Sequence, residues 1–252
     1  MKRIKLTVAY DGSNYCGWQV QPNGETIQGL LNWHLSQLLG EEIKTIGASR
    51  TDAGVHARGN VAVFDTETKI LPEKISYALN ARLPQDIRVW ESKEVDKSFH
   101  PRFAKTVKTY EYCILNRKFA DPLHRLYSYF CYVPLDVEKM KEAAAYLEGE
   151  HDFKSFCTEN PQITSTVRQI YRIEIEKKED LIRIEICGNG FLYNMIRIIA
   201  GTLMEVGRGK IPPEKIKEIL SAKDRNLAGP TARACGLTLK EILYPEWEEL
   251  NN

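Results

Sequence analysis

The first hundred residues alternate between strand and helix patterns, and this order limits the possible folds more than any other feature of the chain. Residues 3–10 (RIKLTVAY) alternate polar and apolar side chains and stop at Asp11-Gly12, which predicts a strand that ends in a turn. Apolar residues at helical spacing then run from Ile27 to Leu39, and Gly40 closes that segment. A strand followed by an amphipathic helix is therefore expected at the N-terminus.

Three more strands and a second helix complete the first half. Strands are expected over Ile43–Ser49 and Asn60–Thr66, on either side of the loop Arg50–Gly59. Pro72 begins a second helix, and Ile87–Val95 has the pattern of a last strand. The order strand, helix, strand, strand, helix, strand is typical of the ferredoxin-like fold.

The second half repeats this pattern less regularly. The expected elements are strands over 107–115, 167–177, 181–187 and Leu237–Leu243, and helices over 136–147, Phe191–Val206 and the segment that Pro212-Pro213 begins. The predicted fold class is α+β, an α/β sandwich of two ferredoxin-like halves with antiparallel sheets around a central cleft. The expected domains are residues 1–104 and 105–252.

Neither the net charge nor the spacing of the cysteines indicates a particular ligand. The 35 basic and 34 acidic residues give a net charge of +1, so composition alone does not indicate nucleic acid. From Arg102 to Arg125 six basic residues stand against two acidic ones, which fits a phosphate-contacting stretch or an ordinary solvated surface. The six cysteines form no CxxC pair, so we expect reduced thiols and neither a zinc site nor a disulfide framework.

No segment has the features of a signal peptide or a membrane helix. The apolar run of Met1–Tyr10 is interrupted by Lys5, and no stretch approaches the roughly 18 apolar residues that a membrane helix needs. We therefore expect a cytoplasmic protein without a membrane partner.

The segment Ala48–Ala57 (ASRTDAGVHA) is the densest cluster of reactive side chains. It holds Arg50, Asp52 and His56 among small residues, and Gly54 can adopt backbone angles that other residues avoid. Such a loop can present a carboxylate into a cleft. Without further information, an aspartate two residues before a glycine is more often a turn former than a catalytic group.

Residues 49–57 (SRTDAGVHA) resemble the catalytic motif of the tRNA pseudouridine synthase A family. Further blocks resemble that family in the same order, from residue 8 to residue 239. These blocks are Tyr10-Asp11-Gly12 with Gly17-Trp18-Gln19, Thr26-Ile27-Gln28-Gly29, Lys108-Thr109-Tyr110-Glu111-Tyr112, the segment from Gly190 to Arg197, and Gly229-Pro230-Thr231-Ala232 with Gly236-Leu237. The resemblance covers nearly the whole chain.

The resemblance implies a fold, a reaction and partners. The fold is two ferredoxin-like halves around a central RNA-binding cleft, usually as a homodimer. The reaction is the isomerisation of uridine to pseudouridine at positions 38, 39 and 40 of the tRNA anticodon stem-loop, and it proceeds by base flipping. No metal, nucleotide or other cofactor is required.

The same resemblance gives residues their roles, with Asp52 as the catalytic nucleophile. An ionised carboxylate can attack the sugar, attack the base, or act as a base through a glycal-like intermediate, and the residues leave these open. Tyr110 would stack on the flipped base and assist removal of the C5 proton. Arg197 would pair with Asp52, and Arg50 would fill the place of the base or hold a phosphate, with Arg58 and Lys108 as further substrate contacts.

Each of these residues also has a plain structural interpretation. Tyr110 and Tyr112 lie two apart on a strand and can be a packed core pair. Arg197 can extend to solvent from a helix edge, and Arg50 can be an ordinary surface residue. His56 follows Asp52 by four residues without a third ligand nearby, so we assign it a structural role rather than a metal.

Two other functions compete with the isomerase hypothesis. One is a non-catalytic RNA-binding protein or tRNA folding chaperone on the same scaffold. The other is a nucleoside-processing hydrolase, although no second acidic residue lies in the Asp52 loop. The chain departs from the family pattern at Ser49, Pro101 and Arg233, where glycine, alanine and proline are usual.

Overall fold

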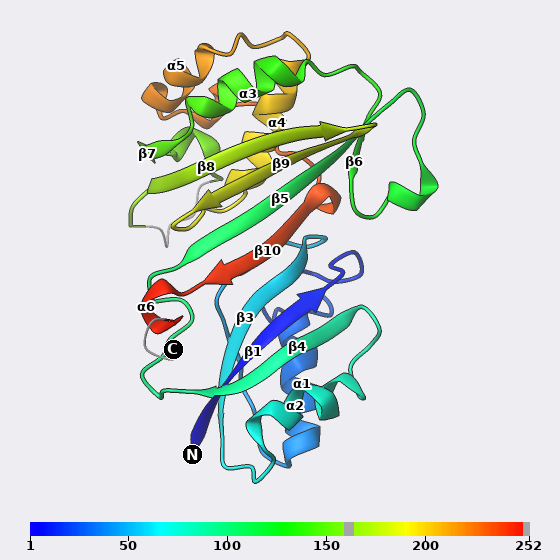
Figure 1. Ribbon diagram of the computed structural model, residues 1–252, viewed down its shortest axis with the longest axis vertical. Coiled ribbons are helices and arrows are strands. Elements are labelled where there is room, and N and C mark those ends of the chain that lie inside the picture. The colour runs from blue at the N-terminus through cyan, green and yellow to red at the C-terminus, as the bar shows by residue number, and fades with distance from the viewer. Residues whose placement is uncertain (159–163, 249–252) are drawn as a thin grey trace. The chain divides into compact units, whose positions relative to one another are not determined.

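The computed structural model describes residues 1–158 and 164–248, and the chain divides into two compact units (Figure 1). The first unit comprises Met1–Thr106 together with the chain from Leu239 onward, and the second comprises Val107–Thr238. The last strand therefore belongs mainly to the first unit. The assignment of residues 1–104 and 105–252 as separate functional domains stays a prediction.

The sheet of the first unit is antiparallel around its first strand. Strand β1 (Lys2–Tyr10) pairs antiparallel with β3 (His56–Thr66) on one side and with β4 (Ile87–Val95) on the other. The short β2 (Ile46–Gly47) pairs antiparallel with β3, and β10 (Leu237–Leu243) also neighbours β3. The strand order is β4-β1-β3-β10.

Two helices, α1 (Ile27–Leu39) and α2 (Pro72–Asn80), cover one face of this sheet (Figure 1). Alternate residues of β1, from Ile4 to Val8, are fully buried on that face, as the alternation in the sequence predicts. Helix α1 begins where the side chain of Thr26 accepts a hydrogen bond from the backbone N–H of Gly29 (3.2 Å), and it ends at Gly40 in the left-handed region.

The predicted strand over Ile43–Ser49 was wrong for most of its length. Only Ile46 and Gly47 are in a strand, because side chains of α1 satisfy the backbone before them. Ser36 Oγ accepts from the backbone N–H of Ile43 (2.9 Å) and Asn32 Oδ1 from that of Thr45 (2.9 Å). With these hydrogen bonds made, the segment needs no strand partner.

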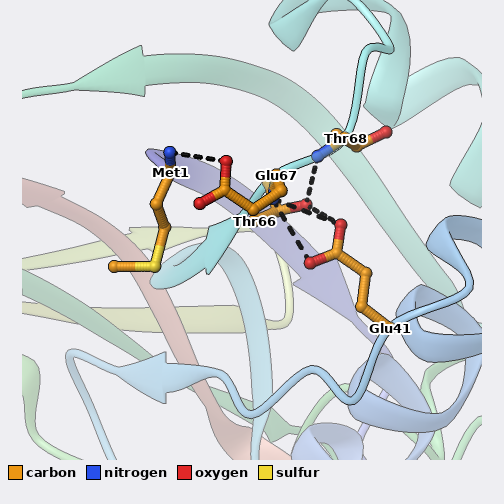
Figure 2. A network of polar contacts seen from close by, with 5 residues as sticks. All are labelled: Met1, Glu41, Thr66, Glu67 and Thr68. Atoms are coloured by element: carbon orange, nitrogen blue, oxygen red, sulfur yellow. Dashed lines mark hydrogen bonds and ion pairs between the residues drawn. The ribbon is translucent and has the colours of Figure 1, made fainter.

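A network of polar contacts fixes the end of β3 that lies farthest from the Asp52 loop (Figure 2). The carboxylate of Glu41, just after α1, accepts hydrogen bonds from the hydroxyl of Thr66 (2.6 Å) and from the backbone N–H of Glu67. The hydroxyl oxygen of Thr66 accepts from the backbone N–H of Thr68, and the amino group of Met1 pairs with Glu67 at 2.7 Å. These contacts join α1, β1 and β3.

The second unit contains an antiparallel sheet in the order β5-β9-β8-β7. Its strands are β5 (Val107–Asn116), β7 (Gly149–Asp152), β8 (Val167–Lys178) and β9 (Leu181–Gly188), and a short β6 (Tyr129–Cys131) runs parallel to β5. Strands β8 and β9 form an antiparallel hairpin, and Glu179 adopts φ 55° in its turn. The sequence did not predict β6 or β7.

Helix α4 (Met195–Gly207) forms the core of the second unit. Nearly all of its residues are buried, and α3 (Val137–Ala145) packs against it. The predicted start at Phe191 was wrong, because Asn194 adopts φ 60° and interrupts the helical backbone. The remaining helices are α5 (Lys215–Ala222), α6 (Pro245–Glu248) and the 3-10 turns Pro122–His124, Lys154–Phe156, Arg225–Leu227 and Ala234–Gly236.

Antiparallel strands covered by helices in both units confirm the predicted α+β class. In the described parts of the chain, no helix has both the length and the apolar character required to cross a membrane.

Candidate active site

Asp52 lies in the short connection between β2 and β3, residues 48–55. Burial alternates along it, because Ser49 and Thr51 are buried, whereas Arg50 is exposed and Asp52 is half-buried. The backbone N–H of Val55 donates to the carbonyl of Asp52 (3.1 Å), which closes a turn in which Gly54 adopts φ 77°. The connection therefore gives Arg50 and Asp52 more access to solvent than the residues between and before them.

The buried side chains of this connection are held by a polar cluster under it. The hydroxyl groups of Tyr10 and Thr51 are 2.7 Å apart. The side-chain amide of Asn60, which has no exposed surface, donates to the hydroxyl of Tyr10 (3.2 Å) and to the carbonyl of Ser49 (3.0 Å). Buried polar groups that are fully bonded in this way fix a backbone strongly. The cluster thus determines where the backbone of Asp52 lies.

The segment Asp11–Trp18 packs directly against the backbone of the same connection. The backbone N–H of Trp18 donates to the carbonyl of Thr51 (3.0 Å), and that of Gly54 donates to the carbonyl of Tyr15 (3.4 Å). At Gly12 a Cβ atom would lie 2.0 Å from the carbonyl oxygen of Val55. The glycines in this part of the sequence are therefore required by the close approach of two backbones.

Replacing Gly17 by alanine is expected to destabilise the first unit. Gly17 adopts φ 87°, and its Cβ would lie 2.6 Å from the carbonyl oxygen of Thr51. Backbone strain and the steric clash together should lower the free energy of unfolding by about 3 kcal/mol, measured by urea denaturation. Gly40→Ala is the matched control, since φ is 71° there but no atom lies within 4 Å of the added Cβ, and about 1 kcal/mol is expected. Equal losses in the two variants would contradict the proposed steric contact.

His56 supports the same connection from the start of β3. It is buried, and its Nδ1 accepts a hydrogen bond from the backbone N–H of Gly12 (3.0 Å) and lies 3.1 Å from the carboxylate of Asp11. Nδ1 accepts from Gly12 when it carries no proton and donates to Asp11 when it carries one, so the two contacts are alternatives. These contacts fit the structural role that the sequence suggested.

The described residues around Asp52 do not form a metal site. Among residues 1–158 and 164–248, no group of three or more histidine, cysteine, aspartate and glutamate side chains has an arrangement that could hold a metal ion.

Arg102 was not assigned to the site from the sequence, although it was counted in a basic stretch. Its guanidinium donates to the carbonyl of Gly47 (3.2 Å), immediately before the Asp52 connection. Burial and the nearby charge of Arg50 lower the pKa of Arg102. Two guanidinium groups therefore lie near one another in the first unit, whereas Arg58 is a separate exposed residue on β3.

Tyr110 lies on β5 in the second unit, opposite Ile186 of β9. Its ring is mostly buried and meets Phe191 edge to face, with the ring centroids 5.4 Å apart. Tyr112 is fully buried, its hydroxyl donates to the carbonyl of Arg233 (2.9 Å), and burial raises its pKa. Both tyrosines thus contribute to packing, and Lys108 at the start of the same strand is half-buried.

Arg197 lies in the first turn of α4 and is held by two neighbouring groups. Its Nε donates to the carbonyl of Ala232 (2.7 Å), and one terminal nitrogen donates to the side chain of Asn194 (2.9 Å). The backbone N–H of Ala232 returns a hydrogen bond to the carbonyl of Arg197 (3.0 Å). The guanidinium therefore has a fixed position relative to the segment 229–232.

The six residues expected at the site divide between the two units. The first unit contains Arg50, Asp52 and Arg58, and the second contains Lys108, Tyr110 and Arg197. The sequence motifs did not indicate that Arg102 or the buried Asn60 belongs to the site. Asn60 had a visible signal, since it is a polar residue at the start of an otherwise apolar strand pattern.

Comparison with known proteins gives one consistent family. The family model described as tRNA pseudouridine synthase matches residues 6–104 and 143–245. The tRNA pseudouridine synthase A of Thermoanaerobacter sp. strain X514 is 51% identical over 244 residues, which cover 97% of this chain and 100% of that protein. The protein of the same name from Brevibacillus brevis strain 47 is 48% identical, with the same two coverages.

One solved structure shows a much weaker similarity. The archaeal box H/ACA sRNP Nop10-Cbf5 complex contains a chain with 13% identity and a TM-score of 0.33. The match covers 94% of this chain and 46% of that chain, so this chain spans about half of its length.

Proposed function

The chain belongs to the tRNA pseudouridine synthase family and is an isomerase that acts on tRNA, and from this premise we propose that it converts uridine to pseudouridine at positions 38, 39 and 40 of the anticodon stem-loop. Asp52 is the nucleophile in this proposal. The structure of the 48–55 connection supports this role of Asp52 most. A buried polar cluster fixes its backbone, whereas the side chain of Asp52 is only half-buried.

The reaction replaces the glycosidic bond between C1′ of the ribose and N1 of uracil by a bond between C1′ and C5. The bond between C1′ and N1 of uracil breaks, the base turns over, a bond forms between C1′ and C5, the C5 proton leaves, and N1 takes up a proton, so that the product is an isomer of uridine. Nothing is oxidised or hydrolysed, so a carboxylate that forms and then releases a covalent bond is sufficient. No cofactor or metal takes part in the proposed reaction. The target base must first leave its stack, at a cost of a few kcal/mol.

The remaining residues hold the RNA and the flipped base in this proposal. Tyr110 stacks on the uracil and assists removal of the C5 proton, and Arg197 pairs with Asp52 and keeps it ionised. Arg50 takes the place of the base or holds the adjacent phosphate, and Arg58 and Lys108 contact the RNA backbone. These roles require the second unit to meet the Asp52 connection on the same substrate.

Mapping of pseudouridine in a defined RNA tests the proposed reaction directly. Purified protein is incubated with an unmodified tRNA transcript that carries uridine at positions 38, 39 and 40, and pseudouridine is located by chemical labelling. Modification at these positions is expected. Pseudouridine elsewhere would contradict the site assignment, binding without any product would favour an RNA chaperone, and free uracil would indicate a hydrolase.

Removing the hydroxyl of Tyr110 is expected to slow the reaction without weakening RNA binding. Tyr110→Phe keeps the ring and its contact with Phe191, so kcat should fall about 100-fold or more while the Kd for tRNA is retained. Tyr112→Phe is the matched control, because it removes a hydroxyl that bonds to the carbonyl of Arg233 and should affect stability alone. Release of tritium from C5-labelled tRNA measures the rates, and equal rates in the two variants would refute the role of Tyr110.

We also propose that the protein acts as a cytoplasmic homodimer. Sedimentation equilibrium would give twice the mass of 28.9 kDa if this is correct. A single species of 28.9 kDa at the concentration of the activity assay would contradict it.

A further inference from the structure

The second unit contains a pocket that none of the assigned site residues lines. Its volume is about 380 Å³, and it lies among the connection from β5 to β6, β6 itself and the turn at 233–235. This volume is at the small end of the range of about 300 to 1,000 Å³ that ligand pockets occupy. The lining residues are Leu115, Ala120, Asp121, His124, Arg125, Ser128, Tyr129, Phe130, Arg233 and Cys235.

The charged groups of this pocket leave an excess of positive charge. Asp121 is already used, since it accepts from the backbone N–H of Leu123 (2.9 Å) and lies 2.9 Å from Nδ1 of His124. These hydrogen bonds lower the pKa of Asp121 and keep it ionised, so it balances one positive charge at most. Arg125 donates to the carbonyl of Pro122 (2.8 Å), a neutral group, and Arg233 is exposed. The ligand that fits two such guanidinium groups is an anion.

The walls of the pocket also provide aromatic surface. Tyr129 and Phe130 line it, and the same connection carries the exposed Phe119 and Tyr127. Rings combined with guanidinium groups are typical of surfaces that bind single-stranded nucleic acid, where bases stack and phosphates pair with arginine. An acidic peptide would satisfy the charges but would leave the rings without a planar partner. A nucleotide satisfies both.

We propose that this pocket is an RNA-binding subsite for one unstacked nucleotide of the tRNA, lined by none of the residues of the Asp52 connection. Arg125 and Arg233 hold its phosphate, and Tyr129 and Phe130 contact its base. The inference rests on the proposed function in so far as tRNA is the ligand. It adds a contact for recognition of the substrate and no step of the reaction.

The double variant Arg125→Ala/Arg233→Ala tests the phosphate contact. Equilibrium binding of an unmodified tRNA transcript is measured by fluorescence anisotropy over a series of salt concentrations. Affinity should fall about tenfold, and the slope of log K against log salt should become shallower by about 1, because one phosphate contact is lost. A variant that binds with unchanged Kd and unchanged slope would overturn the proposal.

Tyr129→Leu tests the base contact by a different signature. Leucine keeps an apolar side chain but removes the stacking ring, so affinity should fall about tenfold while the salt slope stays the same. A loss of affinity that comes with a shallower slope would show that the tyrosine acts through the charges instead, and would refute stacking.

Arg117→Ala is the matched control for charge. Arg117 belongs to the same connection and lies 3.5 Å from Asp180, but it does not line the pocket. It should leave Kd and slope within about twofold of the wild type, as for most surface changes. If Arg117→Ala weakens binding as much as the double variant, the effect is general charge and the subsite is wrong.

Two checks separate the possible failures. Arg125→Lys/Arg233→Lys keeps the charges and should retain the salt slope, and circular dichroism shows whether each variant keeps its fold. The assay of pseudouridine in wild-type protein is independent of these measurements. Absence of product there would refute the proposed reaction, whereas product formation with unaltered binding in the double variant would refute the subsite alone.

Discussion

Replacement of Asp52 by asparagine is expected to abolish pseudouridine formation, with kcat at least about 10⁴-fold lower and the Kd for tRNA changed less than about twofold. Asparagine has nearly the same shape but cannot form the covalent bond that the reaction needs. The turn itself should persist, because the backbone N–H of Val55 donates to the backbone carbonyl of residue 52, which asparagine also has. Tritium release from C5-labelled tRNA and filter binding give the two quantities.

Asp65→Asn is the matched control for loss of a carboxylate in the first unit. Asp65 makes two hydrogen bonds to the guanidinium of Arg3, at 2.8 and 2.7 Å, and this pairing lowers its pKa. The control should lose some stability but should release tritium at the rate of the wild type. Residual activity of Asp52→Asn above about 1% of the wild type would show that the carboxylate is not the nucleophile.

Replacement of Gly201 by alanine is expected to have the largest effect on stability. A Cβ at Gly201 would lie 1.8 Å from the carbonyl oxygen of Pro230, so α4 and the segment 229–232 would have to separate. The same segment holds Arg197 through Ala232, and the backbone N–H of Gly229 donates to the hydroxyl of Thr202 (2.9 Å). These contacts would be lost together, and the free energy of unfolding should fall by more than about 4 kcal/mol.

Gly209→Ala separates this clash from ordinary glycine effects. Gly209 adopts φ 74°, but no atom lies within 4 Å of an added Cβ, so about 1 kcal/mol is expected. Thermal unfolding of both variants, followed by circular dichroism, provides the comparison. A melting temperature of Gly201→Ala equal to that of Gly209→Ala would mean that the backbones can move apart at little cost.

Local patterns were sufficient to predict most elements of the fold. The alternation in residues 3–10 and the apolar spacing in Ile27–Leu39 correspond to β1 and α1. Prediction failed where distant groups satisfy the backbone, as at Ile43, whose N–H bonds to Ser36. It also failed at Asn194, because the side chain alone does not indicate a left-handed backbone.

The candidate site was found in the sequence through its motif, but the physical reasons for that motif are visible only in the structure. Gly12 and Gly17 were recognised as part of a signature, and the structure shows that each touches the backbone of the Asp52 connection. Asn60 contacts the carbonyl of Ser49, and Arg102 contacts the carbonyl of Gly47. The hydrophobic periodicity of the sequence indicates neither contact. Whether the residues of the two units meet on one substrate stays a prediction.

The three departures from the family pattern share one property. Ser49 accepts a hydrogen bond from Asn60, Pro101 from the hydroxyl of Tyr244 (2.9 Å), and Arg233 from the hydroxyl of Tyr112, and each does so with its backbone carbonyl. Every residue has this carbonyl, so the side chain can change while the contact remains. Arg233 also lines the pocket in the second unit.

The return of the chain to the first unit after Thr238 has a consequence for synthesis. Tyr244 packs on Phe99, with the ring centroids 5.0 Å apart, and Lys105 pairs with Glu246 at 2.6 Å. The ribosome makes Tyr244 and Glu246 more than a hundred residues after the first strands, so residues 107–238 of the second unit are synthesised before the part of β10 that belongs to the first unit. Synthesis of the unit that carries Asp52 therefore begins first and ends last. Until then, the nascent form of this unit lacks its final strand.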